Sequence, residues 1–583
     1  MIVLDSFIYD KIGKQAYGVT TTPFLDKLKE KSLNTTNLYS PGPFTEAAVI
    51  SLLSGNDSLN EGGYMHNLNT KKNHYIDVFY ENGYELYNIF YPYFMYSDEV
   101  LKKIDHQFFS YDFIFNSVYL NRLEYFISLS NIRELTNHEY EDIFKQLNIT
   151  FTAWDNFLNY NENTKDKYQL IKKELINYDF SENRAKLKVE WIKYLHNPKD
   201  YFESLKKLKR NHPLFRITRV DAYDLVNRKI VNKLFYRNNK SFILKVIFLQ
   251  FYYTLKNNNI NWKKWWISFK SNIIEKRVSG YNKSVIFSLF VGNFTLKYKK
   301  HNFLKEMPSF GRQIELMMDT LKKRKTSEKP YMALIHPQDL HNRTSFFSYD
   351  TEHEELLLEE LNRMKEYLNQ VNNKFEGSLI YDFSVVYVDL CIKRLFESLK
   401  NYNLLENTVV VITADHGCSY VNAPIRDVFV NNFHTENYRI PLYIYEQSLS
   451  PCTLNYYYKS RDVLPTIYKI CGIDAPNNIS GKSIRDSDYV PDYAISEYMG
   501  GGCPDLRLRP IQYIIRDAKY LLACNLLLSE PFSKINIVEI YDLEKDRDEV
   551  FNLKNNSDFK LEKIHYLLKK IERRHCEIQN QYL

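Results

Sequence analysis

Residues 407–417 read Asn-Thr-Val-Val-Val-Ile-Thr-Ala-Asp-His-Gly. The apolar run Val409–Thr413 predicts a strand that is buried on both faces of a sheet. Asp415, His416 and Gly417 follow directly after this run. In open α/β sheets, ligands bind beyond the carboxyl ends of the strands, so these polar side chains are candidates for a functional site.

Further apolar runs predict other strands of the same sheet, at Ile2–Leu4, Tyr331–Ile335 and Ile440–Tyr445. Helical patterns alternate with them, for example over Thr22–Lys31 and Tyr381–Leu399. Such alternation is typical of a largely parallel sheet that is covered by helices. The sequence therefore predicts an α/β fold, an α/β/α sandwich with a mixed, largely parallel central sheet.

The chain of 583 residues is too long for one simple core, and its character changes twice along its length. The middle carries long helical patterns and all five Trp, whereas the last part carries short strand-like runs. We expect a split core at 1–100 and 326–450, a mainly helical insertion at 101–325, and a small C-terminal α+β subdomain at 451–583. Within that subdomain the expected elements are strands at Ala494–Glu497, Tyr513–Arg516 and Tyr520–Ala523, and a terminal helix over Asp558–Ile571.

Charge and cysteine content narrow the class of protein. The net charge of +7 comes from 78 basic and 71 acidic residues, too weak a bias for a nucleic-acid binder of this length. The seven Cys form no CxxC pair, which favours reduced thiols. Neither a signal peptide after Met1 nor a run of eighteen apolar residues is present, so we expect a cytoplasmic protein.

Aromatic and basic side chains mix at Trp262–Trp266 and Lys297–Lys300. Such a mixture is compatible with peripheral contact to a membrane surface or with binding of an anionic polymer. The plainer alternative is a helix with a Trp face towards the core and a solvated Lys face.

Asp and His residues stand at several predicted strand ends. Asp5 ends the first strand, His336 follows Tyr331–Ile335, and Asp415 and His416 follow the strand quoted above. If these strands are parallel neighbours, the side chains converge at one edge of the sheet and suit Zn²⁺ or Mn²⁺ better than Ca²⁺. The alternative is that each Asp caps a helix and that His336 is a buried histidine bonded to backbone.

Thr45 lies between the turn Pro41-Gly42-Pro43 and the helical pattern Glu46–Ser54, which Gly55 ends. This place predicts Thr45 as the N-cap of the helix. A helix N-terminus also attracts phosphate or sulfate, because its free N–H groups point outwards. A nearby divalent ion would stabilise the alkoxide of Thr45, so the hydroxyl is a candidate nucleophile and metal ligand.

As an ordered set, these segments resemble the sulfatase and alkaline phosphatase superfamily. Residues 407–417 are similar to its metal-binding signature, residues 2–6 to its first strand, and Thr45 occupies the place of its nucleophile. Two further segments agree, namely 461–473 with a family helix and its turn, and 539–553, which includes Glu549, with the closing motif. The resemblance covers roughly residues 1–100 and 328–555, and it implies an enzyme in which Asp5, Thr45, Asp415 and His416 hold a divalent metal ion.

The nucleophile motif departs from that of sulfatases. They carry Cys or Ser, with Pro two positions on and Arg four positions on, and convert that Cys or Ser to formylglycine. Here the positions are Thr45, Ala47 and Val49, and Thr cannot be converted by that route. Thr resembles the branch of phosphoethanolamine and phosphoglycerol transferases, which implies transfer or hydrolysis of a phosphate ester, on a cell-envelope or capsular glycan or a lipid-linked substrate.

A second group of side chains comprises Asp339, His341 and His434. They could bind a second metal ion, since two-metal phosphatases need further ligands. Alternatively, His341 and His434 hydrogen-bond the transferred group and protonate the leaving alkoxide. One ion is expected and two are allowed.

Two rival functions remain open. The first is hydrolysis of sulfate esters without formylglycine. The second is a glycan-binding scaffold without catalysis, which would have no need of the ligands Asp5, Asp415 and His416. The sequence predicts neither the donor and acceptor nor the oligomeric state.

Overall fold

The computed structural model describes most of both ends of the chain and parts of its middle. The described residues are 1–16, 19–64, 71–89, 102–107, 179–208, 211–217, 310–322, 329–340, 379–418, 433–500 and 509–582, with Arg324 and isolated positions between 68 and 158. The Trp262–Trp266 and Lys297–Lys300 segments lie outside the described residues, as does His341.

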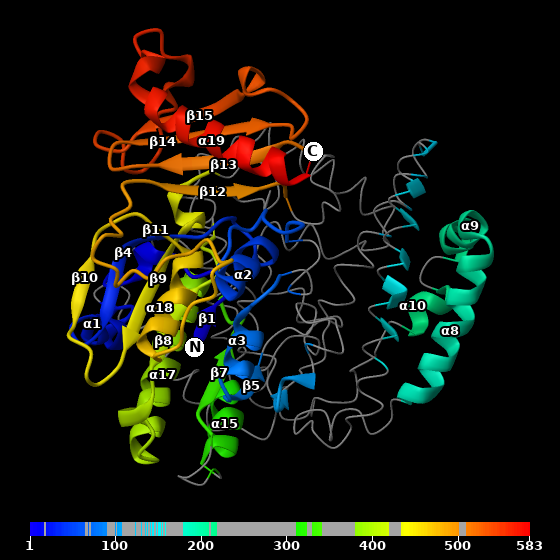
Figure 1. Cartoon of the computed structure of the whole chain (residues 1–583), viewed down its shortest axis with the longest axis horizontal. Helices are drawn as coiled ribbons and strands as arrows, with labels where there is room; N and C mark the ends of the chain where they lie inside the picture. The colour runs from blue at the N-terminus through cyan, green and yellow to red at the C-terminus, as the bar shows by residue number, and fades with distance from the viewer. Residues whose placement is uncertain are drawn as a thin grey trace, which may run out of the picture. The chain divides into compact units, whose positions relative to one another are not determined.

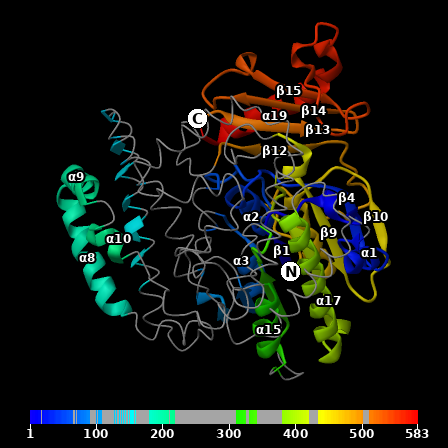
Figure 2. The same cartoon turned by 180° about the vertical axis from the view of Figure 1, so that it is seen from behind.

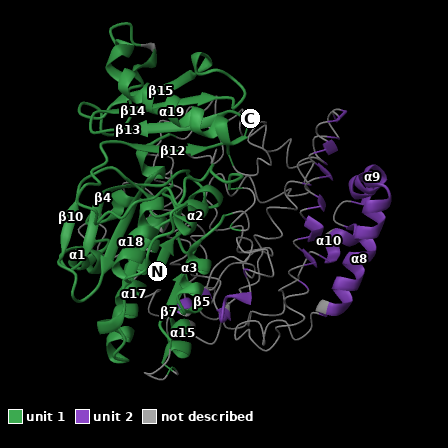
Figure 3. Cartoon of the chain, viewed as in Figure 1, with its two compact units in different colours: residues 1–86, 314–341, 381–583 green, residues 87–313, 342–380 purple. Residues whose placement is uncertain are grey.

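The chain forms two compact units (Figure 3). Unit 1 comprises residues 1–86, 314–341 and 381–583, and unit 2 comprises residues 87–313 and 342–380. The C-terminal residues belong to unit 1 together with the first strands of the chain. The boundaries predicted at residues 100, 326 and 450 stay a prediction.

The central sheet is mixed and largely parallel, and this confirms the predicted α/β fold class. β1 (Ile2–Leu4) pairs in parallel with both β7 (Tyr331–Ile335) and β8 (Val410–Ala414). The described strands follow the order β10 (Cys452–Leu454), β4 (Leu33–Tyr39), β9 (Arg439–Tyr445), β8, β1, β7, β5 (Glu85–Ile89), β6 (His106–Gln107), and β11 (Tyr458–Lys459) pairs with β4. β9 runs antiparallel to its neighbours β8 and β4.

Helices cover both faces of this sheet. Figures 1 and 2, seen from opposite sides, show α2 (Thr45–Ser54) and α18 (Val463–Ile470) over one face and α17 (Leu379–Asn401) over the other. On the α17 side, the Phe396 ring lies 5.2 Å from that of Phe24 in α1 (Pro23–Lys29), measured between ring centroids. Two further described helices are α3 (Tyr75–Glu81) in unit 1 and α15 (Phe310–Leu321), most of which also belongs to unit 1.

α2 begins at Thr45, and its N-cap residue is Phe44. The prediction that Thr45 is the N-cap is therefore wrong. Phe44 has the extended backbone of a cap residue (φ −155°, ψ 152°), so the helix starts one residue earlier than predicted, at Thr45 itself. The helix ends at Gly55, as predicted, in the left-handed conformation (φ 68°). Its last eight residues are all buried, so packing rather than capping stabilises α2.

The C-terminal part carries a four-stranded antiparallel sheet. Its strands are β12 (Ala494–Tyr498), β13 (Ile511–Arg516), β14 (Tyr520–Leu526) and β15 (Asn536–Asp542), of which the first three were predicted. The terminal helix α19 spans His565–Tyr582, so the predicted bounds Asp558–Ile571 are wrong. The helix extends further because its buried face continues through Arg574 and Ile578.

The described part of unit 2 includes three helices, α8 (Phe180–His196), α9 (Pro198–Leu208) and α10 (Pro213–Ile217). α8 begins at a well-formed cap, where the Asp179 side chain accepts a hydrogen bond from the backbone N–H of Glu182 at 2.8 Å. Across the described helices of both units, none is long and apolar enough to cross a membrane.

Candidate active site

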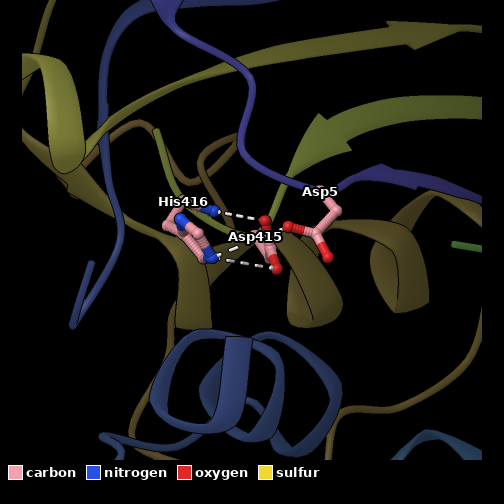
Figure 4. Close-up of side chains that lie close together, drawn as sticks. All are labelled: Asp5, Asp415 and His416. Atoms are coloured by element: carbon pink, nitrogen blue, oxygen red, sulfur yellow. Dashed lines mark hydrogen bonds and ion pairs between the residues drawn. The ribbon is translucent and has the colours of Figure 1, made fainter. Parts of the chain in front are cut away.

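The three parallel strands β7, β1 and β8 end in polar residues at one edge of the sheet. Asp5 follows β1, His336 follows β7, and Asp415 and His416 follow β8. One ligand atom from each of Asp5, Asp415 and His416 lies within 4.8 Å of the others, and all three residues are buried (Figure 4). The parallel pairing thus brings together the side chains whose convergence was expected from the strand ends.

Backbone and side-chain donors orient the two carboxylates. The Ser6 hydroxyl donates to Asp5 Oδ1 and the Gln338 amide donates to Asp5 Oδ2, both at 2.9 Å. The backbone N–H groups of Ser6 and His416 donate to Asp415 Oδ1 at 3.0 and 2.6 Å. Ser6 makes its bond from a left-handed backbone conformation (φ 65°), which is strained for a residue with a Cβ. The strained residue therefore lies directly after Asp5, just beyond the end of β1.

A backbone contact determines the tautomer of His416. His416 Nδ1 lies 2.6 Å from the carbonyl oxygen of Gly417. A carbonyl can only accept a hydrogen bond, so Nδ1 carries the proton and the neutral ring keeps a lone pair on Nε2. That Nε2 faces the carboxylates, 3.7 Å from Asp5 Oδ1 and 3.6 Å from Asp415 Oδ2. The ring is therefore oriented as metal-ligating histidines usually are, with the second nitrogen bonded to a backbone carbonyl.

The residues present fit a divalent cation. Asp415 Oδ2 is buried and receives no hydrogen bond from any described residue. Two carboxylates buried this close together repel each other and lose hydration, a cost that a cation between them would offset. Two carboxylate oxygens and one imidazole nitrogen suit Zn²⁺ or Mn²⁺. Which metal the site selects stays a prediction.

Thr45 lies beside this cluster. Its Oγ1 is 3.4 Å from His416 Nε2, and the residue is partly exposed. As the first residue of α2, it stands where unpaired backbone N–H groups and the helix dipole favour an anion. One edge of the sheet therefore carries a hydroxyl, three side chains that could hold a metal ion, and the N-terminus of a helix.

His336 lies against Asp415, one of these three residues. It is fully buried, and its Nε2 lies 3.5 Å from Asp415 Oδ2. Asp339 is also buried, on the turn that follows β7, but it is not among the three residues whose ligand atoms meet. A second metal site at Asp339, His341 and His434 remains a prediction, since His341 lies outside the described residues.

His434 lies against Glu549. Its Nδ1 is 3.3 Å from Glu549 Oε2, and the hydrogen bond with this carboxylate raises the pKa of the His434 imidazole. Arg516 also donates to Glu549, at 3.0 Å. Sequence reasoning assigned no role to Glu549, although the closing motif contained it, and it gave no role to Gln338 or Ser6. Their proximity to Asp5 and His336 in the sequence was the available signal for the last two.

Two curated proteins are similar in sequence to parts of this chain. An arylsulfatase of Clostridium perfringens is 26% identical over 230 residues, which are 37% of this chain and 44% of that protein. An endo-4-O-sulfatase of Bacteroides thetaiotaomicron is 27% identical over 113 residues, 19% of this chain and 22% of that protein. The chain thus spans less than half the length of these curated relatives.

A solved structure from glycosaminoglycan metabolism in Bacteroides thetaiotaomicron has the same fold, with a TM-score of 0.50 at 13% identity. The match covers 100% of this chain and 96% of that one. The sequence model of the sulfatase family matches residues 1–171 and 254–473, more than half of the chain. The chain therefore belongs to the sulfatase family.

Proposed function

We propose that this chain is a metal-dependent enzyme that cleaves or transfers a phosphate ester through a covalent intermediate on Thr45. The observation that carries the proposal is the place of Thr45 Oγ1, 3.4 Å from His416 Nε2 and beside the buried Asp5 and Asp415 carboxylates. A hydroxyl so close to a set of metal ligands is suited to nucleophilic catalysis.

The reaction would have two steps. Thr45 Oγ attacks phosphorus and loses its proton, the bond to the ester oxygen breaks, and that oxygen takes up a proton and leaves as the alcohol, so that a phosphorylated Thr45 forms. Water or an acceptor alcohol then attacks phosphorus, its proton passes to Thr45 Oγ, and the hydroxyl is regenerated. A divalent ion held by Asp5, Asp415 and His416 would lower the pKa of the hydroxyl and offset the negative charge of the substrate. The backbone N–H groups at the start of α2 would orient the anion in both steps.

The side chains near Thr45 favour phosphate over sulfate. Formylglycine cannot form from Thr, and positions 47 and 49 hold Ala and Val, both fully buried in α2. Val49 therefore offers no charge where sulfatases place Arg. A phosphate ester needs only an alcohol nucleophile and cationic support, which this site can supply.

Hydrolysis of sulfate esters is the second candidate, and the family favours it. The two curated relatives are an arylsulfatase and an endo-4-O-sulfatase. In either case, we propose that the ester group is carried by a glycan or a lipid-linked compound. Rates with 4-nitrophenyl phosphate and 4-nitrophenyl sulfate would separate the candidates, because a sulfate-specific enzyme would turn over only the second.

The decisive experiment is mass spectrometry of the Mn²⁺-loaded full chain after incubation with phosphate monoester and phosphodiester donors. We expect an adduct on the peptide that contains Thr45, and its loss in Thr45→Ala together with a fall in kcat of at least about 10³-fold. Thr36→Ala is the matched control, because the Thr36 hydroxyl donates to Asn455 at the surface. Full metal-dependent turnover by Thr45→Ala would refute the proposal.

A further inference from the structure

Glu549 is the centre of a buried polar cluster that carries His434. Its carboxylate accepts hydrogen bonds from the backbone N–H of Thr435 at 2.7 Å and from Arg516 at 3.0 Å. The Thr435 hydroxyl also donates to it, and His434 Nδ1 lies 3.3 Å away. The Glu549 side chain is 3% exposed, whereas that of His434 is 42% exposed. The cluster therefore has a buried anchor and an accessible imidazole.

Both the backbone conformation of Glu549 and the burial of its carboxylate are energetically unfavourable. Glu549 lies in the turn after β15 with a left-handed backbone (φ 55°), a conformation that residues with a Cβ rarely adopt. Burying its charge is also unfavourable unless the charge is paired. Arg516, itself buried on β13, supplies that charge and also donates to the Thr435 hydroxyl. A strained turn residue whose charge is held in a buried ion pair is more typical of a functional site than of a solvent-exposed loop.

The His434 segment is in direct contact with the metal-ligand turn. Residues Thr435–Asn437 form a short 3-10 helix directly after His434. The backbone N–H of Gly417 donates to the Asn437 carbonyl at 2.9 Å, and a Cβ built on Gly417 would lie 1.8 Å from the Glu436 carbonyl oxygen. Gly417 in turn accepts the hydrogen bond that orients His416. The segment His434–Asn437, which is hydrogen-bonded to Glu549, therefore packs directly against the turn that carries His416.

We propose that Glu549 is a positioning residue that holds His434 towards the substrate anion at the Thr45 site. This inference deepens the proposed function and rests on it. With Nδ1 turned to Glu549, the opposite nitrogen, Nε2, is the one presented outwards. An imidazole N–H oriented in this way donates a hydrogen bond to a phosphate oxygen or to the leaving oxygen. The C-terminal sheet, through β13 and the turn after β15, is thus part of the catalytic machinery.

A double-mutant cycle tests this role, because a residue that acts only through another has no effect once that other is removed. The full chain, loaded with Mn²⁺, is prepared as wild type, Glu549→Gln, His434→Gln and the double variant. Three quantities are measured for each: kcat/KM with 4-nitrophenyl phosphate, the Kd for inorganic phosphate and the Kd for Mn²⁺. Glu544→Gln is the matched control, because Glu544 is exposed and pairs only weakly with Lys519, at 3.4 Å.

We expect Glu549→Gln to raise the Kd for phosphate and to lower kcat/KM, each about 10- to 100-fold, as the loss of an orienting partner commonly does. In the His434→Gln background the same change should have no further effect, and Mn²⁺ affinity should stay within about twofold of wild type throughout. Glu544→Gln should match wild type. If Glu549→Gln does not fold, Glu549→Asp takes its place, since it keeps the charge beside Arg516 but withdraws it from His434.

The inference is overturned if the loss caused by Glu549→Gln persists unchanged in the His434→Gln background, because Glu549 then acts independently of His434. Wild-type behaviour of Glu549→Gln would overturn it equally. The Kd for inorganic phosphate tests this inference separately from the proposed function. If no ester is turned over but phosphate binding shows the coupling, the proposed reaction fails and the positioning role stands.

Discussion

Replacing Gly417 with Ala is a sharp test of the site, because the structure gives the size of the perturbation. A Cβ at position 417 would lie 1.8 Å from the Glu436 carbonyl oxygen and 2.8 Å from its carbon. Cβ atoms essentially never approach another heavy atom closer than 3.0 Å, so the two backbone segments must separate by about 1.2 Å. The atoms that the Cβ would meet belong to the backbone of Glu436, so no flexible side chain can absorb the shift.

This separation acts on His416. The Gly417 carbonyl orients the imidazole through Nδ1, so moving the turn moves Nε2 relative to Asp5 and Asp415. A misplacement of about 1 Å at a reacting centre can cost about 100-fold in rate, and a disturbed orienting bond costs about 10- to 100-fold in metal affinity. We therefore expect Gly417→Ala to weaken Mn²⁺ binding about 10- to 100-fold and to lower kcat/KM about 100-fold.

Isothermal titration of the metal-free full chain with Mn²⁺ measures the first effect, and turnover of 4-nitrophenyl phosphate measures the second. Gly83→Ala is the matched control. Its Cβ would meet nothing within 4 Å, and its positive φ (77°) predicts only a loss of about 1 kcal/mol in stability. Wild-type Mn²⁺ affinity and turnover in Gly417→Ala would refute the reasoning, because the contact would then have no effect on the ligand.

Two further predictions concern stability. Arg574 donates two hydrogen bonds of 2.6 Å to the buried Glu497, so Arg574→Met should leave that charge unpaired and reduce the free energy of unfolding by about 3–5 kcal/mol; a loss below about 1 kcal/mol in urea denaturation would contradict this. Burial lowers the pKa of His212 from 6.5 to about 4. Between these values the unfolded chain binds a proton that the folded chain does not, so stability around α8 and α10 should fall as pH falls from 6.5 towards 4. Amide exchange of residues 180–217, corrected for its intrinsic pH dependence, should accelerate over that window in wild type and less so in His212→Gln.

Four neighbouring strands of the central sheet, β9, β8, β1 and β7, could be predicted from sequence, because each is short and mostly apolar. The run predicted at Val409–Thr413 forms a strand one residue later, at Val410–Ala414, and β7 has the predicted bounds. Their parallel pairing with β1 then brings Asp5, His336 and Asp415 together without further information. The buried cluster could be predicted from sequence because it depends on where the strands end, and the hydrophobic pattern marks those ends clearly.

Elements without a clear apolar period were missed. β15 buries only Ile540 and Tyr541 among its seven residues, so its pattern did not predict a strand. The contacts of Glu549 could not be predicted from sequence for another reason. Glu549 and Thr435 are 114 residues apart in the chain, and only tertiary packing brings the two turns together. The contact of Gly417 with Glu436 likewise leaves no trace in either segment alone.

The start of α2 has a consequence for how this protein could change its chemistry. Because Phe44 is the cap residue and no side chain caps the helix, the Thr45 hydroxyl contributes nothing to holding α2 together. The helix depends instead on its buried apolar residues and on Gly55. Exchange of the group at position 45 among alcohol, thiol or methyl therefore leaves the scaffold nearly unaffected. At this position, selection for reactivity is separate from selection for folding, so a new nucleophile can be tried without loss of the native structure.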